Sequence, residues 1–195
     1  MTEIKIEKKQ PVWPWIALIA GILALIYYLF VHDQADKVDE NEVTTTETTT
    51  VVTDDMNNKV ADYNSFISDD ASMSMDHEYS SSALMKLIDA AEEVANAKGV
   101  DIKADLDLAR QNASEITNDR EKLNHADKIK SAGTIIVQAL KKVQTEKFPN
   151  LENNLMGVQD ALGKIKPTTP TLDQKEAVKG FFTQAGELLT NMKSN

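Results

Sequence analysis

The residues of this 195-residue chain that are best suited to chemistry are two methionines and a histidine in the segment Met73-Ser-Met75-Asp-His77. Thioether sulfur and imidazole nitrogen are ligands that soft metals such as Cu(I) prefer. His77 and His125 each lie near the start of a predicted helix, and these two helices run in the same direction in an antiparallel bundle. Both histidines would then lie at one end of the bundle. A copper or zinc ion held by them with Met73, Met75 or a neighbouring carboxylate is one interpretation.

The same segment also has an ordinary structural interpretation. Asp76 suits the N-cap position of a helix, and Met73 and Met75 can pack the start of that helix against a core. Three histidines in the whole chain are no enrichment. Metal binding by a helical bundle is therefore the alternative function, and we expect neither a bound metal nor a cofactor.

Other sequence patterns of enzymatic sites are absent. The chain lacks the paired Glu-x-x-His of di-iron bundles, the H-E-x-x-H of zinc hydrolases and the G-x-S-x-G of serine hydrolases. Five residues separate Gly157 from Gly163, and Ile165 stands where a phosphate-binding loop has a hydroxyl. Neighbouring acids such as Glu92 and Glu93 point to different sides of a helix. We expect that the protein is not an enzyme.

The distribution of charge excludes one class of partner. The chain has no cysteine and a net charge of -10, of which residues 33–58 contribute -7 through eight acidic side chains and one lysine. Residues 59–195 carry only -4. Nucleic-acid binding needs a basic face that meets phosphates, so we expect no nucleic-acid partner.

Residues 12–31 predict a transmembrane helix, since VWPWIALIAGILALIYYLFV has twenty residues and no charge. At about 1.5 Å per residue this length matches the roughly 30 Å hydrocarbon layer. Trp13 and Trp15 at one end and Tyr27 and Tyr28 near the other are typical of aromatic belts at membrane interfaces. The run is longer than the apolar region of a cleavable signal peptide, and no small-residue cleavage site follows it. We expect a retained signal-anchor.

Lysine placement predicts the orientation of this span. Lys5, Lys8 and Lys9 precede it and only Lys37 follows it closely. The positive-inside rule places residues 1–11 in the cytoplasm and the rest of the chain in the periplasm or outside the cell. The expected location is the cell (inner) membrane, with a single pass.

One face of the predicted span carries small residues. Ala17, Gly21 and Ala24 share this face, and Ala17 and Gly21 form a small-xxx-small pair that permits close helix approach. Apolar spans often contain such pairs by chance. A weak homodimer through this face is therefore an alternative to a monomeric span.

Residues 32–56 predict a disordered, acidic, threonine-rich tether that includes VTTTETTTVV at positions 43–52. Few large apolar side chains and many like charges leave too little surface to bury. A flexible coil of this length would span on the order of 25–30 Å. A short strand at Val51-Val52 is the structured alternative.

Residues 57–195 predict an antiparallel bundle of four to five main helices, which makes the chain all-α. Apolar residues recur at intervals of three and four in a short helix around Val60, Tyr63 and Ile67. The same spacing predicts helices over about 76–98, 101–118, 121–147, 150–165 and 172–193. Gly99 should end the second of these six helices, and Thr171 with Gln174 resembles a capping box for the last.

These features together predict a membrane-anchored, extracytoplasmic binding or scaffolding protein. Its partner is expected to be another protein of the cell envelope. The sequence indicates no binding face, because every strong apolar stripe is needed for the core.

Overall fold

The computed structural model describes residues 44–69, 77–118 and 125–194, although not the side chains of residues 44–52 and 77. The predicted cytoplasmic segment, the span over residues 12–31 and the tether up to residue 43 lie outside these ranges. The chain divides into two compact units, residues 1–44 and 45–195, and the second contains nearly all described residues. None of the described helices is both long enough and apolar enough to cross a membrane.

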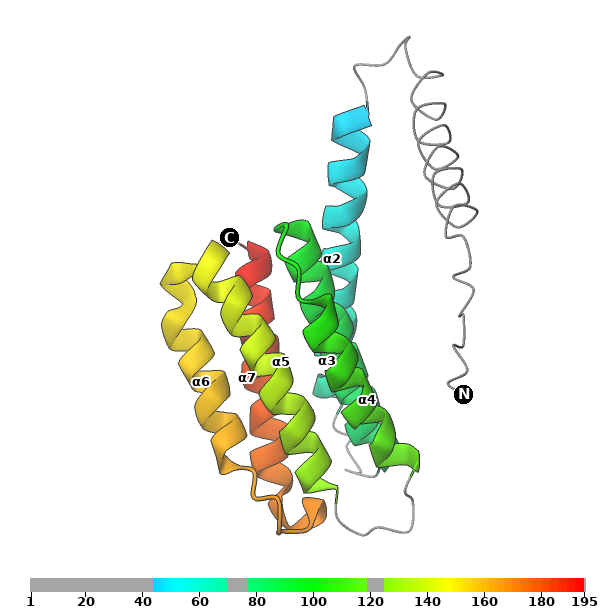
Figure 1. Cartoon of the computed structure of the whole chain (residues 1–195), viewed down its shortest axis with the longest axis vertical. Helices are drawn as coiled ribbons and strands as arrows, with labels where there is room; N and C mark the ends of the chain where they lie inside the picture. Colours follow the sequence, from blue (N-terminus) through cyan, green and yellow to red (C-terminus); the bar gives the residue numbers. More distant parts are fainter. Residues whose placement is uncertain (1–43, 70–76, 119–124, 195) are drawn as a thin grey trace, which may run out of the picture. The chain divides into compact units, whose positions relative to one another are not determined.

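The described residues are all-helical, which confirms the predicted fold class for this part of the chain. Successive helices alternate in direction, as Figure 1 shows, so the up-and-down bundle is also confirmed. The elements are α2 (Thr44–Ser68), α3 (His77–Ala97), α4 (Lys103–Asn118), α5 (Ala126–Lys147), the 3-10 turn η1 (Pro149–Leu151), α6 (Glu152–Lys164), the 3-10 turn η2 (Thr171–Gln174) and α7 (Lys175–Ser194).

Helix α3 lies at the centre of the contacts. It packs against α4, α5 and α7, while α5 also contacts α4 and α6, and α6 packs on α7. Helix α2 lies against both α3 and α7, because Lys59 pairs with Asp89 of α3 and the Tyr63 hydroxyl donates to the Phe182 carbonyl of α7 at 2.8 Å. Helix α7 buries eight residues, among them Val178, Phe181 and Leu188, which agrees with its contacts to several neighbours.

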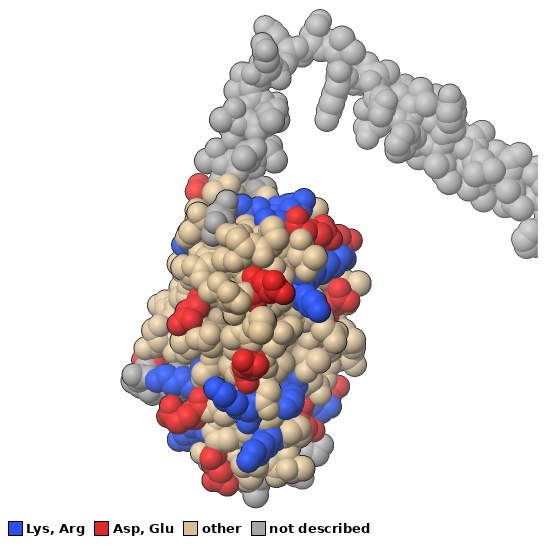
Figure 2. All heavy atoms as spheres, turned by 90° about the vertical axis from the view of Figure 1, so that its left-hand side faces the viewer, with Lys and Arg blue, Asp and Glu red and all other residues tan. Residues whose placement is uncertain are grey.

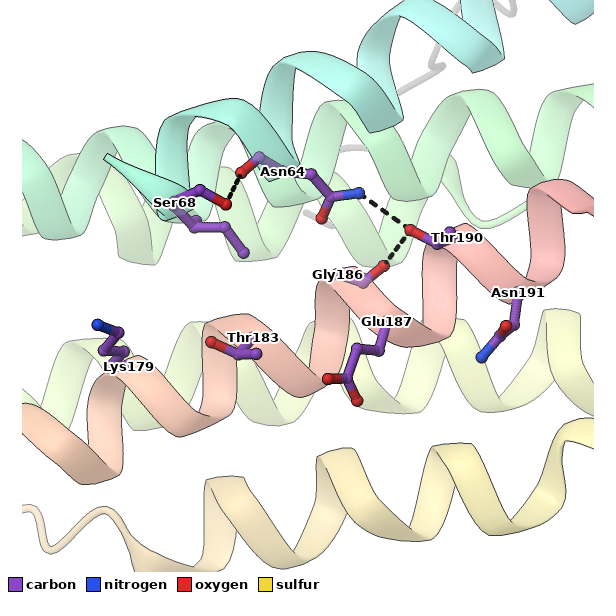
Figure 3. A pocket seen from close by; sticks show the side chains of 9 residues that line it. Asn64, Ser68, Lys179, Thr183, Gly186, Glu187, Thr190 and Asn191 are labelled. Carbon is purple, nitrogen blue, oxygen red and sulfur yellow. Dashed lines mark hydrogen bonds between the residues drawn. The ribbon is translucent and has the colours of Figure 1, made fainter. Parts of the chain in front are cut away.

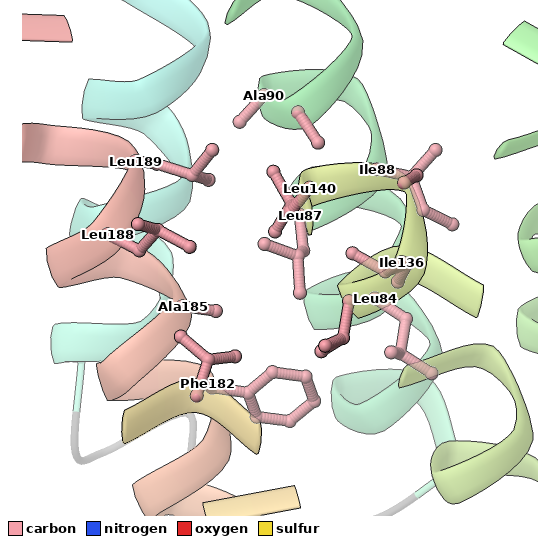
Figure 4. Packing of buried hydrophobic residues seen from close by; sticks show 14 of the residues in the cluster. Leu84, Leu87, Ile88, Ala90, Ile136, Leu140, Phe182, Ala185, Leu188 and Leu189 are labelled. Carbon is pink, nitrogen blue, oxygen red and sulfur yellow. The ribbon is translucent and has the colours of Figure 1, made fainter. Parts of the chain in front are cut away.

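The core forms where the apolar seams predicted from sequence meet. Side chains from α3, α5 and α7 converge in Figure 4, including Leu84, Leu87, Ile136 and Phe182. Every apolar residue used to predict helices α4 and α5 is buried: Ile102, Leu106, Ala109, Ala113 and Ile116, then Ala126, Ile129, Gly133, Ile136, Leu140 and Val143. The three-four spacing therefore identified the core-facing sides of these helices correctly.

Helix α2 is much longer than the short helix predicted near Val60. It begins at Thr44, so the backbone of residues 44–56, assigned to the tether from sequence, is helical. Met56 is only 4% exposed and extends the buried seam one turn before Val60, which is why packing starts before residue 57. The alternative of a strand at Val51-Val52 is wrong, because both residues belong to α2. The described residues accordingly form six helices, α2 to α7, where four to five main helices and one short helix were predicted.

Of two helix boundaries predicted from sequence, one is confirmed and the other is wrong. Gly99 has a φ of 69°, and Val100 N–H donates to the Ala95 carbonyl at 2.9 Å, so the predicted stop after α3 is confirmed. The capping box is wrong. Thr171 starts η2 instead of capping α7, and Gln174 bonds across the preceding loop to the backbone N–H and C=O of Lys166.

Two glycines allow helices to approach closely. A Cβ at Gly133 of α5 would lie 2.7 Å from Leu162 Cδ1 and 3.1 Å from Phe181 Cζ. A Cβ at Gly186 of α7 would overlap Asn64 Oδ1 and lie 3.3 Å from Tyr63 Cε1. These positions bring α5 onto α6 and α7, and α7 onto α2.

Candidate functional site

A hollow of about 600 Å³ lies between α2 and α7 (Figure 3). Asn64 and Ser68 of α2 form one wall, and Thr183, Gly186 and Thr190 of α7 form the other. The hollow exists because α7 presents small and short side chains here, so little fills the space beside the helix. Its volume falls within the range of roughly 300–1,000 Å³ that is typical of ligand pockets.

A second hollow of about 490 Å³ lies on the other side of α7, against α6. Gly157 and Ala161 of α6 and Gly180 of α7 leave room for it, because none of them carries a long side chain. Lys179 and Thr183 line both hollows. The two hollows and the ridge of α7 between them therefore form one continuous surface, which we call the α7 face.

Polar groups in the first hollow are fixed by hydrogen bonds. Asn64 Nδ2 donates to Thr190 Oγ1 at 3.0 Å, and Thr190 Oγ1 donates to the Gly186 carbonyl at 2.8 Å. Ser68 Oγ donates to the Asn64 carbonyl at 2.7 Å. Hydroxyls and amides held in place in this way present ordered donors and acceptors to an incoming polar group.

The structure brings the two predicted metal-ligating histidines to the same end of the bundle. His77 begins α3 and His125 immediately precedes α5, and these helices run in the same direction in Figure 1. The His125 side chain is buried and makes no capping hydrogen bond to α5. Met73, Met75 and the His77 side chain lie outside the described residues.

The metal interpretation therefore stays a prediction. Within residues 44–69, 77–118 and 125–194, no three His, Cys, Asp or Glu side chains are grouped as a metal ion would require. That statement does not extend to the segment that contains Met73 and Met75.

The most densely charged part of the described bundle is an ion-pair network over α2, α3 and α4. Arg110 of α4 contacts Asp89 at 3.3 Å, Asp107 at 3.1 Å and also Glu92, while Lys59 of α2 reaches Asp89 at 3.8 Å. Burial alone would lower the pKa of Arg110, but hydrogen bonds with Glu92 and Asp89 raise it above its ordinary value. The network joins α3 to α4 through Arg110, while Lys59 of α2 reaches only its exposed edge at Asp89.

Glu93 lies beside this network, and its surroundings disfavour the charged form of its carboxyl group. Partial burial raises the pKa of its carboxyl, and the carboxylates of Asp55 and Glu92 raise it further, although Lys59 acts against them. A raised pKa is a feature of some catalytic acids, but structural ion-pair networks produce it as well. Since Glu93 lines neither hollow of the α7 face, we attribute its shift to helix packing.

No protein-family model, curated protein or solved structure matches this chain. A function must therefore be inferred from the surface of the bundle itself. The α7 face was missed by the sequence analysis, because it results from how α2 and α6 lie against α7. One signal for it was present: Gly180, Thr183 and Gly186 place short side chains along the last predicted helix.

Proposed function

We propose that this protein is a membrane-anchored, extracytoplasmic binding or scaffolding protein and that a partner protein binds its α7 face. The anchor is the span predicted over residues 12–31, and residues 32–43 link it to the helical unit. The observation that carries the proposal is the pair of hollows of about 600 and 490 Å³ that share Lys179 and Thr183.

The shape of the α7 face supports a protein partner. The surface has two hollows beside one helical ridge. Side chains or a loop of a partner can insert into these hollows. Buried pockets that receive anchor side chains are where protein interfaces concentrate their binding energy. The apolar seams of the bundle are already used by its core, so the interface is expected to be polar at its rim and modest in size.

Charge on the α7 face supports the same conclusion. Lys179 and Glu187 line the first hollow, and Asp160, Lys164 and Glu176 are among the residues that line the second. Figure 2 views the bundle from the side of α6 and shows basic and acidic side chains scattered over a largely uncharged surface. Such a mixture suits a partner with both signs of charge, whereas a nucleic acid would require a basic surface.

Anchoring explains how a modest interface can suffice. Confinement to the membrane raises the effective concentration of the bundle near a partner in the same membrane or close to it. The linking segment would set the distance over which the bundle searches. Scaffolding of this kind needs no chemical step by the bundle itself.

A photo-crosslinking amino acid placed at Thr183 tests the proposal in intact cells. Thr134 of α5 is the matched control, because it is also an exposed helical threonine. We expect a discrete crosslinked protein from position 183 and none from position 134. Thr183→Arg, which places a long charged side chain at the position that lines both hollows, is expected to weaken recovery of that protein about tenfold or more. Equal capture at both positions, or none at position 183, would contradict the proposal.

A further inference from the structure

Helix α2 is attached to the bundle through one narrow stripe. Among residues 53–69, only the four side chains of Met56, Val60, Tyr63 and Ile67 are buried. In the central helix α3, by contrast, eleven of the 20 residues from 78 to 97 are buried. Although two of those eleven are serines and four are alanines, α2 places fewer side chains in the core per residue than α3 does, and burial of apolar surface is the main term that offsets ordering entropy.

Most polar contacts of α2 lie at the surface. Lys59 and Asp89 are 47% and 44% exposed, and exposed ion pairs contribute little stability. The hydrogen bond between Asn64 and Thr190 is exposed as well. Solvent competes for these groups whenever α2 moves, so they do little to hold it.

Among the described residues, Tyr63 makes the contacts that hold α2 most firmly to the bundle. Its side chain is completely buried, and its hydroxyl donates to the Phe182 carbonyl at 2.8 Å. Burial, and secondarily Tyr79, raises the pKa of Tyr63 well above its ordinary value, so the phenol stays protonated and able to donate. One turn away, Phe66 stacks on Tyr79 of α3 with ring centroids 5.2 Å apart, but it is only partly buried.

The remaining helices contact one another without α2. Helix α3 packs directly on α7, α6 joins α7 to α5, and α4 covers α3 and α5. The hollow of about 600 Å³ shows that the C-terminal end of α2 does not fill the space against α7. As the first helix of the described unit, α2 can leave without any later segment having to move through the fold.

From these four observations we propose that α2 is a detachable strap. It covers the groove between α3 and α7, opens as a unit while α3–α7 stay folded, and closes again. Opening exposes Tyr79, the Phe182 backbone and the surface around Gly186, all of which α2 now covers. One consequence depends on the proposed function: Asn64, Ile67 and Ser68 form a wall of the first hollow, so opening removes that wall from the α7 face.

Native-state hydrogen exchange of the full chain in detergent micelles tests the strap without any partner. Amides in the C-terminal turns of α2 are expected to exchange about tenfold or more faster than those of α3 and α5, because local opening needs less free energy than global unfolding. Equal protection of α2, α3 and α5, with one common dependence on denaturant, would overturn the proposal.

The chain has no cysteine, so a disulfide can pin the strap. A Cβ at position 186 overlaps Asn64 Oδ1, which is two bonds from the Asn64 Cβ. The two Cβ atoms are therefore at most about 4.7 Å apart, close to the roughly 3.5–4.5 Å that a disulfide bridges. In the double variant Asn64→Cys and Gly186→Cys, oxidation should bring the protection of α2 to that of α7, and reduction should reverse it. Unchanged exchange of α2 after oxidation would contradict a detachable strap.

Tyr63→Ala provides an independent test of autonomy. Loss of the Tyr63 contacts is expected to bring exchange in α2 close to that of an unstructured chain, while rates in α3–α7 change by less than about threefold. If Tyr63→Ala instead removes protection from the whole bundle, α2 is an integral core helix and the strap is disproved. Neither result depends on crosslinking at Thr183, so failure of the strap and failure of the proposed function are distinguishable.

Discussion

Replacing Phe181 with alanine is expected to lower the free energy of unfolding by about 3–5 kcal/mol. The ring is fully buried in α7, lies 5.4 Å from the Phe182 ring and faces the backbone of α5 at Gly133. Its removal leaves a cavity between helices that cannot collapse, because their positions are set by many other contacts. Denaturant unfolding of the purified chain, followed by circular dichroism, measures the loss.

Phe66→Ala is the matched control for that experiment. Phe66 is also an aromatic residue in a helix, but it is only partly buried and packs against the edge of the core. We expect Phe66→Ala to lower the free energy of unfolding clearly less than Phe181→Ala does. A similar cost at both positions would mean that Phe181 is packed no more deeply than Phe66, contrary to the structure.

Replacing Gly133 with leucine is expected to destabilise the bundle by about 3 kcal/mol or more, at the upper end of what overpacking costs. A single Cβ there would already stand 2.7 Å from Leu162 and 3.1 Å from Phe181. The additional atoms of leucine must push α5 away from α6 and α7. Thermal unfolding of the variant and of the parent chain compares the two.

Gly180→Ala distinguishes this steric effect from helix propensity. Gly180 is also a helical glycine, but a Cβ there meets nothing within 4 Å. Glycine is unfavourable within a helix by roughly 0.5–1 kcal/mol relative to alanine, so Gly180→Ala should stabilise the protein slightly. If Gly133→Leu were tolerated equally well, the close approach of α5 to α6 and α7 would be disproved.

Much of the fold could be predicted because it depends on local spacing. Apolar residues at intervals of three and four identified five helices to within a few residues, and Gly99 correctly marked the end of α3. The start of α2 could not be predicted in this way. Threonine is β-branched and has low helix propensity, so VTTTETTTVV favoured a tether, whereas the described backbone is helical from Thr44.

Hydrogen bonds within a loop explain the other difference in the fold. Thr171 and Gln174 have the residue types and spacing of a capping box. In the structure, Gln174 instead bonds to the backbone of Lys166 and Thr169 across the loop after α6. A pattern of four residues cannot reveal a partner that the fold brings from elsewhere.

The candidate site was less accessible from sequence than the fold. Thr183 and Thr190 are ordinary helix-surface residues until α2 and α6 are placed beside α7, which leaves hollows on both sides. The residues that did suggest chemistry, Met73, Met75 and His77, remain a prediction, since the described residues include only the backbone of His77. Spacing along a chain finds core faces well, but a surface made by three helices depends on their packing.

Cysteine labelling from outside the cell tests the central claim that an N-terminal span holds the helical bundle outside the cytoplasm. The absence of native cysteine allows single cysteines at Thr46 and at Glu3 to be labelled in intact cells with a membrane-impermeant thiol reagent. We expect labelling at position 46 and none at position 3 until the cells are lysed. Labelling at position 3 in intact cells, or labelling at position 46 only after lysis, would contradict the claim.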